Sequence, residues 1–184
     1  MNDQQGSSHT LAISAPLDRL AIFLATGLGI GFIPIAPGTF GSLLGVVICY
    51  ALIQAFQFAP HLLLNALLAA CVLLAIGGTW AATRAERILN RKDAGQIVID
   101  EVCGQLITFV FLAPAMVRLG GRWRLALAVG FVLFRLFDIF KPWPIKRLEG
   151  LGNGLGVMAD DVLAGIYAAV TLLWILDFGF WILD

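Results

Sequence analysis

The chain has 184 residues, of which 60% are hydrophobic and only 13% charged, and its mean hydropathy is +0.91. Soluble domains carry about 25% charged residues, so this composition excludes an ordinary soluble protein and predicts a single domain embedded in a membrane. Twelve basic residues balance twelve acidic ones, and at zero net charge we expect no nucleic-acid partner.

The chain begins with a polar segment, residues 1–17, which we expect to be a disordered tail ahead of one helical domain, residues 18–184. The apolar runs lie at residues 20–33, 42–59, 62–82, 97–117, 125–140 and 162–183. A helix needs about 20 apolar residues to cross a bilayer, and the second, third and last runs meet or approach that length. The predicted fold is therefore an all-α, membrane-embedded bundle of about six helices, some of them re-entrant or interfacial.

The basic segment from Arg84 to Lys92 predicts the orientation in the membrane, because cytoplasmic loops are enriched in Lys and Arg. If the second and third runs form a hairpin, Pro37 at the start of the second run lies on the same cytoplasmic side. The segment from Arg118 to Arg124 is also basic, so the fourth and fifth runs cannot both be simple spans. Our hypothesis is that they form a re-entrant or surface-lying hairpin that leaves every polar motif on one face.

The acidic pair Asp100-Glu101 interrupts the fourth apolar run. Acids at an apolar surface are costly, which makes them candidates for a functional site. Adjacent helical residues diverge by about 100°, so both acids reach one cation only near a helix start or an irregular turn. The alternative is that they only complement the dipole of a helix in its first turn.

A ladder of charge is predicted at the end of the fifth run. Arg135, Asp138 and Lys141 follow at three-residue spacing, which stacks them along one helix face. Such a ladder can be purely structural. Pro142 and Pro144 end the helix directly afterwards, however, and this places Lys141 at a helix C-terminus. There it is either a partner of the helix dipole or a point charge for a phosphate.

Glycine-rich turns provide further candidates. The segment from Gly150 to Gly156 contains four glycines and Asn153, and it leads into Asp160 and Asp161. Glycines let backbone N–H groups approach a phosphate, although the segment could equally be a flexible loop with Asp160 as an N-cap. Thr39, in the turn before the second run, is either a helix N-cap or a contact to phosphate.

The available donor atoms favour a hard cation. Carboxylate oxygens without histidine or cysteine partners suit Mg²⁺ rather than Zn²⁺. The cysteines lie singly in apolar runs, as packing residues do, and the two histidines are isolated, so we expect no metal site at either. These residues are Cys49, Cys71, Cys103, His9 and His61.

Taken together, these motifs resemble the phosphatidylglycerophosphatase A family. The matching segments are Pro37–Ser42, Ile97–Val102 with Gly104, Phe134–Pro144 and Gly154–Asp161, so the resemblance covers residues 27 to 167. It implies an all-helical, Mg²⁺-dependent, multi-pass phosphatase of the cell inner membrane. Such an enzyme converts phosphatidylglycerophosphate to phosphatidylglycerol in phospholipid biosynthesis, and here its active site would face the cytoplasm.

The resemblance also implies a site. Lys141 is expected on the substrate phosphate, and Thr39, Arg135, Asn153 and Gly154 are predicted to be further substrate contacts. The predicted metal ligands are Asp100, Glu101, Asp138, Asp160 and Asp161, and all of these except Asp160 are also predicted to be catalytic.

Two positions depart from the family pattern. Family members often have Trp where Ile99 stands, and many have His-Gly-Gly where this chain reads Gly152-Asn153-Gly154. Either that histidine has no catalytic role in the family, or Asn153 takes over a binding contact in this chain.

The predicted reaction is metal-assisted attack of water on a phosphomonoester, rather than formation of a phospho-aspartate. The alternatives are a CDP-alcohol phosphotransferase-like membrane enzyme, an acid-lined cation transporter and a non-catalytic membrane scaffold. The first of these uses a spaced Asp-Gly and Ala-Arg pattern that the segment after Asp160 lacks. The acids lie near segment ends, which favours surface chemistry over transport. The sequence gives no indication of the oligomeric state.

Overall fold

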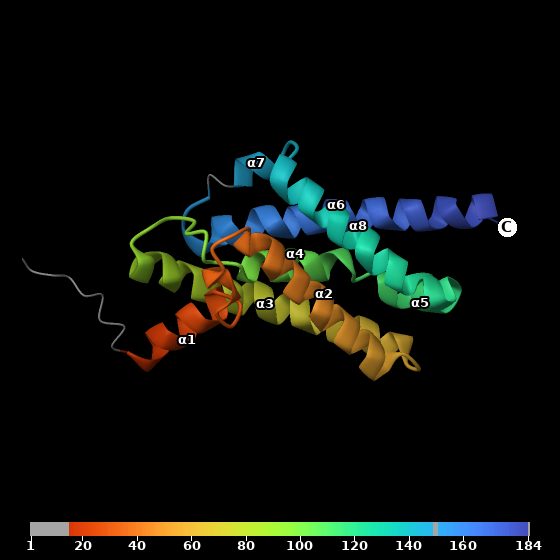
Figure 1. The fold of residues 1–184 in the computed structure, drawn as a ribbon, viewed down its shortest axis with the longest axis horizontal. Coiled ribbons are helices and arrows are strands. Elements are labelled where there is room, and N and C mark those ends of the chain that lie inside the picture. Colours follow the sequence, from red (N-terminus) through yellow and green to blue (C-terminus); the bar gives the residue numbers. More distant parts are fainter. Residues whose placement is uncertain (1–14, 149–150, 184) are drawn as a thin grey trace, which may run out of the picture.

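In a computed structural model, the described residues, 15–148 and 151–183, form an elongated all-helical bundle (Figure 1). Its helices are α1 (Pro16–Ala25), α2 (Pro37–Phe56), α3 (Pro60–Leu89), α4 (Ile99–Thr108), α5 (Leu112–Leu119), α6 (Trp123–Phe140), α7 (Ile145–Leu148) and α8 (Asn153–Leu183), with 3₁₀ turns η1 (Ile30–Phe32) and η2 (Gly120–Arg122). The all-α prediction is confirmed. The predicted tail, 1–17, lies mostly outside the described residues, and α1 already begins at Pro16.

Within the described part of the chain, three helices are long and apolar enough to cross a membrane: α2, α3 and the part of α8 from Gly154 to Asp177. With 30 residues, α3 is about 45 Å long, which exceeds the roughly 30 Å hydrocarbon core of a bilayer. Its last turns carry Arg84 and Arg87, charges that suit the region beyond the apolar layer. The close α2–α3 connection places the start of α2 and the end of α3 at the same end of the bundle (Figure 1).

Small residues bring α2 unusually close to α4. Gly38, Gly41 and Gly45 lie at spacings of three and four, so they share one face of α2. A Cβ added at Gly41 would lie 2.8 Å from the Cβ of Val98, and one at Gly45 would lie 2.8 Å from the Cβ of Gln105. Glycine is therefore required at this helix crossing, as is usual where membrane helices pack backbone to backbone.

On its opposite side, α4 packs equally closely on α8. A Cβ at Gly104 would lie 2.5 Å from the carbonyl oxygen of Asp161, and Gly165 faces the backbone of Gly104. The short helix α4 is thus held between two longer helices that pass within backbone contact. This arrangement fixes the position of the first turn of α4, which carries Asp100 and Glu101.

The fourth apolar run is divided into α4 and α5 by a turn, and α6 returns alongside them. The predicted hairpin is therefore present, but its turn, η2, lies at the opposite end of the bundle from the start of α4 (Figure 1). There Trp123 packs on Tyr50 of α2, with ring centroids 5.6 Å apart. The expectation that every polar motif shares one face is therefore wrong for the segment from Arg118 to Arg124, because α6, at 18 residues, reaches about 27 Å along the bundle.

Candidate active site

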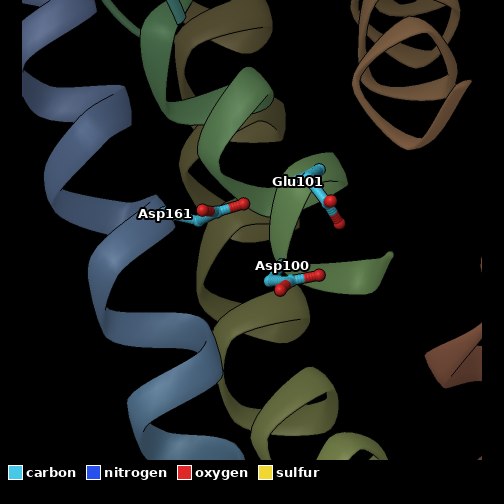
Figure 2. A group of neighbouring side chains, drawn as sticks. All are labelled: Asp100, Glu101 and Asp161. Atoms are coloured by element: carbon cyan, nitrogen blue, oxygen red, sulfur yellow. The ribbon is translucent and has the colours of Figure 1, made fainter. Parts of the chain in front are cut away.

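Three acidic side chains converge where α4 and α8 cross. Asp100 and Glu101 lie in the first turn of α4, the position that allows adjacent acids to face one cation. Asp161 points from α8 towards them (Figure 2). One carboxylate oxygen from each of the three residues lies within 4.8 Å of the others. The acidic pairs from two distant segments of the chain thus form one group.

This acidic group is buried and incompletely satisfied. Asp100 is 7% exposed and Asp161 only 3%. One oxygen on each of Asp100, Glu101 and Asp161 is buried with no hydrogen-bond partner. Buried carboxylates are normally paired or bound to a metal, and oxygen-only donors suit a hard divalent cation. The group is therefore consistent with a divalent metal site.

Burial also shifts the pKa of both acids in the first turn of α4. Burial raises the pKa of Asp100 well above its ordinary value, and the charges of Glu101 and Asp161 raise it further. Burial also raises the pKa of Glu101, with a further contribution from Asp138, while Asp100 and Arg135 act in the opposite direction. A bound cation would reverse these shifts, because it favours the ionised form of each carboxylate.

Two ion pairs flank the acidic group. Arg135 Nη1 donates to Asp138 Oδ2 at 2.6 Å, and Lys141 Nζ donates to Asp160 Oδ2 at 2.6 Å. The predicted ladder therefore forms only in part. Lys141 has left the helix with φ 41° as the cap of α6, which directs its ammonium group to α8 instead of to Asp138. Asp138 and Asp160 adjoin the group of three acids and hold these cations beside it, and Oδ1 of Asp160 is itself buried without a hydrogen-bond partner.

Ser42 is a site neighbour that sequence reasoning missed. Its hydroxyl accepts a hydrogen bond from Arg135 Nη1 at 3.2 Å and donates one to the carbonyl of Gly38 at 2.9 Å. Ser42 lies four residues after Gly38, on the glycine face of α2. That shared face was the signal that could have identified it.

Gly38 gives the Glu101 side chain room to reach the site. A Cβ at Gly38 would collide with the carboxylate of Glu101 and lie 3.4 Å from Nη1 of Arg135. An alanine here would therefore displace the Glu101 carboxylate, whereas Arg135 would be in ordinary van der Waals contact. Gln105, one turn after Glu101 on α4, is fully buried with both polar atoms of its amide unpartnered.

The remaining predicted substrate contacts are placed differently. Thr39 is half-buried in the first turn of α2, at the same end of the bundle as the acids. Gly154 donates its N–H to Thr83 Oγ1 at 3.1 Å, and a Cβ there would lie 2.5 Å from the backbone nitrogen of Thr83. Gly154 therefore anchors α8 to α3 and does not present its N–H to a ligand. The side chain of Asn153 lies outside the described residues.

Comparisons with known proteins point to one family. A family model described as phosphatidylglycerophosphatase A matches residues 23–176. The chain is 39% identical to phosphatidylglycerophosphatase A of Haemophilus influenzae over 85% of this chain and 92% of the relative, and 35% identical to that of Escherichia coli over 83% and 81%. It is also 38% identical, over 83% of this chain and 91% of the relative, to a Bacteroides thetaiotaomicron protein provisionally named a phosphatidylinositol-3-phosphatase. No solved structure matches.

Proposed function

Because the chain belongs to the phosphatidylglycerophosphatase A family, and is therefore a phosphomonoester hydrolase that acts on a phospholipid, we propose that it removes the terminal phosphate of phosphatidylglycerophosphate in a reaction that requires Mg²⁺. The products are phosphatidylglycerol and phosphate, a step of phospholipid biosynthesis. The observation that carries the proposal is the group of three neighbouring carboxylates, each with one buried oxygen that has no hydrogen-bond partner, at Asp100, Glu101 and Asp161.

These three carboxylates would hold the metal ion. Their oxygens suit Mg²⁺, which binds through a small number of carboxylates together with substrate phosphate and water. When bound, the ion supplies positive charge for the phosphate oxygens and lowers the pKa of a water molecule. Burial supports this role, because a site with little water strengthens every electrostatic interaction inside it.

Arg135 and Lys141 would bind the substrate phosphate. A guanidinium carries five N–H donors and an ammonium carries three, so each side chain can stay paired with its acid and still donate to a phosphate. Nε of Arg135 is buried without a partner. In this assignment Asp138 and Asp160 orient the two cations. Both are also further candidate ligands of the metal, and Oδ1 of Asp160 is buried without a hydrogen-bond partner.

Glu101 is the best placed general base. In the reaction, a water oxygen forms a bond to phosphorus and the bond from phosphorus to the glycerol oxygen breaks. The attacking water gives up a proton to a carboxylate, and the departing glycerol oxygen takes a proton from solvent water or from a protonated acid. Glu101 is the least buried of the three acids, and one of its carboxylate oxygens has no hydrogen-bond partner. That oxygen is therefore available to accept the proton of the attacking water.

The site end of the bundle would face the cytoplasm, and the membrane would be the inner membrane. Three long apolar helices indicate membrane association. Arg84 and Arg87 at the end of α3, and Arg91 and Lys92 in the following loop, lie at the same end as the start of α2. An excess of Lys and Arg in such segments favours the cytoplasmic side.

The test is a comparison of lipid substrates. Purified protein in detergent micelles with Mg²⁺ is given phosphatidylglycerophosphate or phosphatidylinositol 3-phosphate, and phosphate release is measured as an initial rate. We expect kcat/KM to be at least about tenfold higher for phosphatidylglycerophosphate, a difference of about 1.4 kcal/mol in transition-state binding. A preference for the inositol lipid would replace the proposal with the activity named for the Bacteroides relative. No release from either lipid would refute the phosphatase proposal.

A further inference from the structure

A second cationic region lies beside the candidate site and has no part in the chemistry described so far. A pocket of about 460 Å³ opens between the end of α3 and the start of α8. Three of its lining residues are basic: Arg87 in the last turn of α3, and Arg91 and Lys92 in the following loop. All three side chains are exposed, so they are accessible to an anion from the aqueous or headgroup layer.

Lys92 connects this pocket to the acidic site. It also lines a neighbouring pocket of about 290 Å³ whose wall includes Asp160. Asp160 in turn accepts the hydrogen bond from Lys141. Polar and charged side chains thus continue from the basic pocket through Lys92 and Asp160 to Asp161, the next residue of α8 and a member of the acidic group.

The basic pocket is shaped by internal hydrogen bonds. The carboxylate of Glu86 accepts the backbone N–H of Asp93 at 2.8 Å, and the carbonyl of Glu86 accepts the N–H of Arg91 at 3.1 Å. Glu86 also lines the pocket, but its Oε1 is directed at the loop backbone. The three basic residues thus outnumber the one acid that faces the same space, which leaves the pocket cationic.

We propose that this pocket binds the phosphodiester group of the lipid substrate. The inference rests on the proposed function, since that substrate carries a phosphodiester one glycerol unit from the phosphomonoester that is hydrolysed. A diester anion brought close to several carboxylates needs a cation to offset their repulsion. Arginine suits it particularly well, because a guanidinium can bind two phosphate oxygens at once. The pocket then distinguishes lipids that carry both phosphate groups from lipids that carry a monoester alone.

The first arm of the test is kinetic and uses the full chain. The variant Arg91→Gln with Lys92→Gln is compared with the wild type on phosphatidylglycerophosphate and on phosphatidic acid, which has a phosphomonoester but no diester. We expect the variant to raise KM for phosphatidylglycerophosphate by about tenfold, the loss of charge-assisted hydrogen bonds, with kcat within about twofold. A rise in KM with unchanged kcat marks lost ground-state binding. Its kcat/KM for phosphatidic acid should not change.

The matched control is Lys146→Gln with Arg147→Gln on α7, which removes the same charge near the same end of the bundle but does not line the pocket. We expect it to leave KM for phosphatidylglycerophosphate within about twofold. An equal rise in both variants would indicate general attraction of an anionic lipid and would overturn the inference. Unchanged KM in the Arg91 and Lys92 variant would overturn it as well, while hydrolysis by the wild type would leave the proposed function standing.

The second arm does not depend on turnover. Phosphatidylglycerol carries the diester without the monoester. It should therefore raise the melting temperature of the EDTA-treated wild type more than phosphatidylcholine does. In the Arg91 and Lys92 variant, the two lipids should have the same effect on the melting temperature. Inorganic phosphate, added with Mg²⁺, should inhibit wild type and variant equally. Loss of phosphate inhibition with intact phosphatidylglycerol binding would place free phosphate in the pocket and refute the diester assignment. If neither lipid is hydrolysed by the wild type, the proposed function fails and this binding arm alone decides the inference.

Discussion

Replacing Asp161 by asparagine should have opposite effects on stability with and without a metal ion. One carboxylate oxygen on each of Asp100, Glu101 and Asp161 lies at most 4.8 Å from the others, and two unit charges at that distance repel each other by about 3.5 kcal/mol at an effective dielectric constant of 20. Asp161 faces two such partners, Asp100 and Glu101, so its charge is costly when no cation is present. Burial raises the pKa of Asp100, which reduces the charge that it carries at neutral pH. We therefore expect Asp161→Asn to stabilise the metal-free protein by about 2 kcal/mol.

Thermal unfolding in detergent, followed in EDTA and then in excess Mg²⁺, measures both effects. For a chain of this size, 2 kcal/mol corresponds to an increase in Tm of about 4–8 °C. Mg²⁺ at about 100 times its Kd should then stabilise the wild type by about 2.7 kcal/mol, and the variant by much less. The same substitution should abolish hydrolysis, because one of the three ligands is lost.

Asp18→Asn is the matched control for Asp161→Asn. Asp18 pairs with Arg84 at 2.6 Å on the surface, where the two side chains are 22% and 35% exposed. Its loss should cost at most about 1 kcal/mol and leave the response to Mg²⁺ intact. The reasoning would be refuted if Asp161→Asn lowered the Tm in EDTA, or if it kept the full stabilisation by Mg²⁺.

Three further predictions concern the same site. Gly38→Ala should reduce kcat/KM at least about tenfold, because the added methyl group collides with the Glu101 carboxylate, whereas Gly77→Ala, which meets open space, should change it less than about twofold; equal effects would contradict this role for Gly38. Lys141→Gln should reduce kcat/KM by about 10- to 100-fold through loss of a charge-assisted hydrogen bond to phosphate, and near-normal kinetics would remove Lys141 from the site. Burial raises the pKa of Asp100, so protons compete with the metal for this carboxylate at lower pH. The concentration of Mg²⁺ that gives half-maximal activity should therefore decrease as the pH is raised from about 6 to about 8. An increase over this range would be inconsistent with carboxylate ligands.

The helical fold and the main acidic group were accessible from the sequence for physical reasons. Apolar runs of about 20 residues have few stable alternatives to helices in a membrane. Acids inside such runs have few roles other than function. The requirement that Asp100 and Glu101 lie near a helix start was also derivable from helix geometry, and both residues occupy the first turn of α4.

Partner choice among the flanking charges was not accessible in the same way. Three-residue spacing predicted that Asp138 and Lys141 would face each other, but the chain leaves the helix at Lys141 with φ 41°, and its ammonium reaches Asp160 on another helix. Ser42 meets Arg135 only because α2 and α6 both pack around α4. Contacts of this kind between side chains depend on how closely two helices cross. The distance of the crossing depends in turn on which glycines, such as Gly104, face another helix, and periodicity alone does not specify which helix that is.

The length of α6 explains the error about the second basic segment. Both the segment from Arg84 to Lys92 and the segment from Arg118 to Arg124 are basic, which suggested that the two segments lie on the same side of the membrane. In the structure, the turn at Gly120–Arg122 lies at the far end of the bundle instead (Figure 1). The positive-inside tendency therefore cannot apply to both clusters at once, and the site end carries the larger group of basic residues.

Metal dependence of phosphate release tests the central claim most directly. Protein purified in detergent is treated with EDTA, supplied with phosphatidylglycerophosphate, and assayed for released phosphate before and after Mg²⁺ is added in excess. Our account predicts no release in EDTA, recovery of activity on addition of Mg²⁺, and no recovery in Asp161→Asn. Undiminished release in EDTA, or full activity of Asp161→Asn with Mg²⁺, would contradict the assignment of the three buried acids as a catalytic metal site.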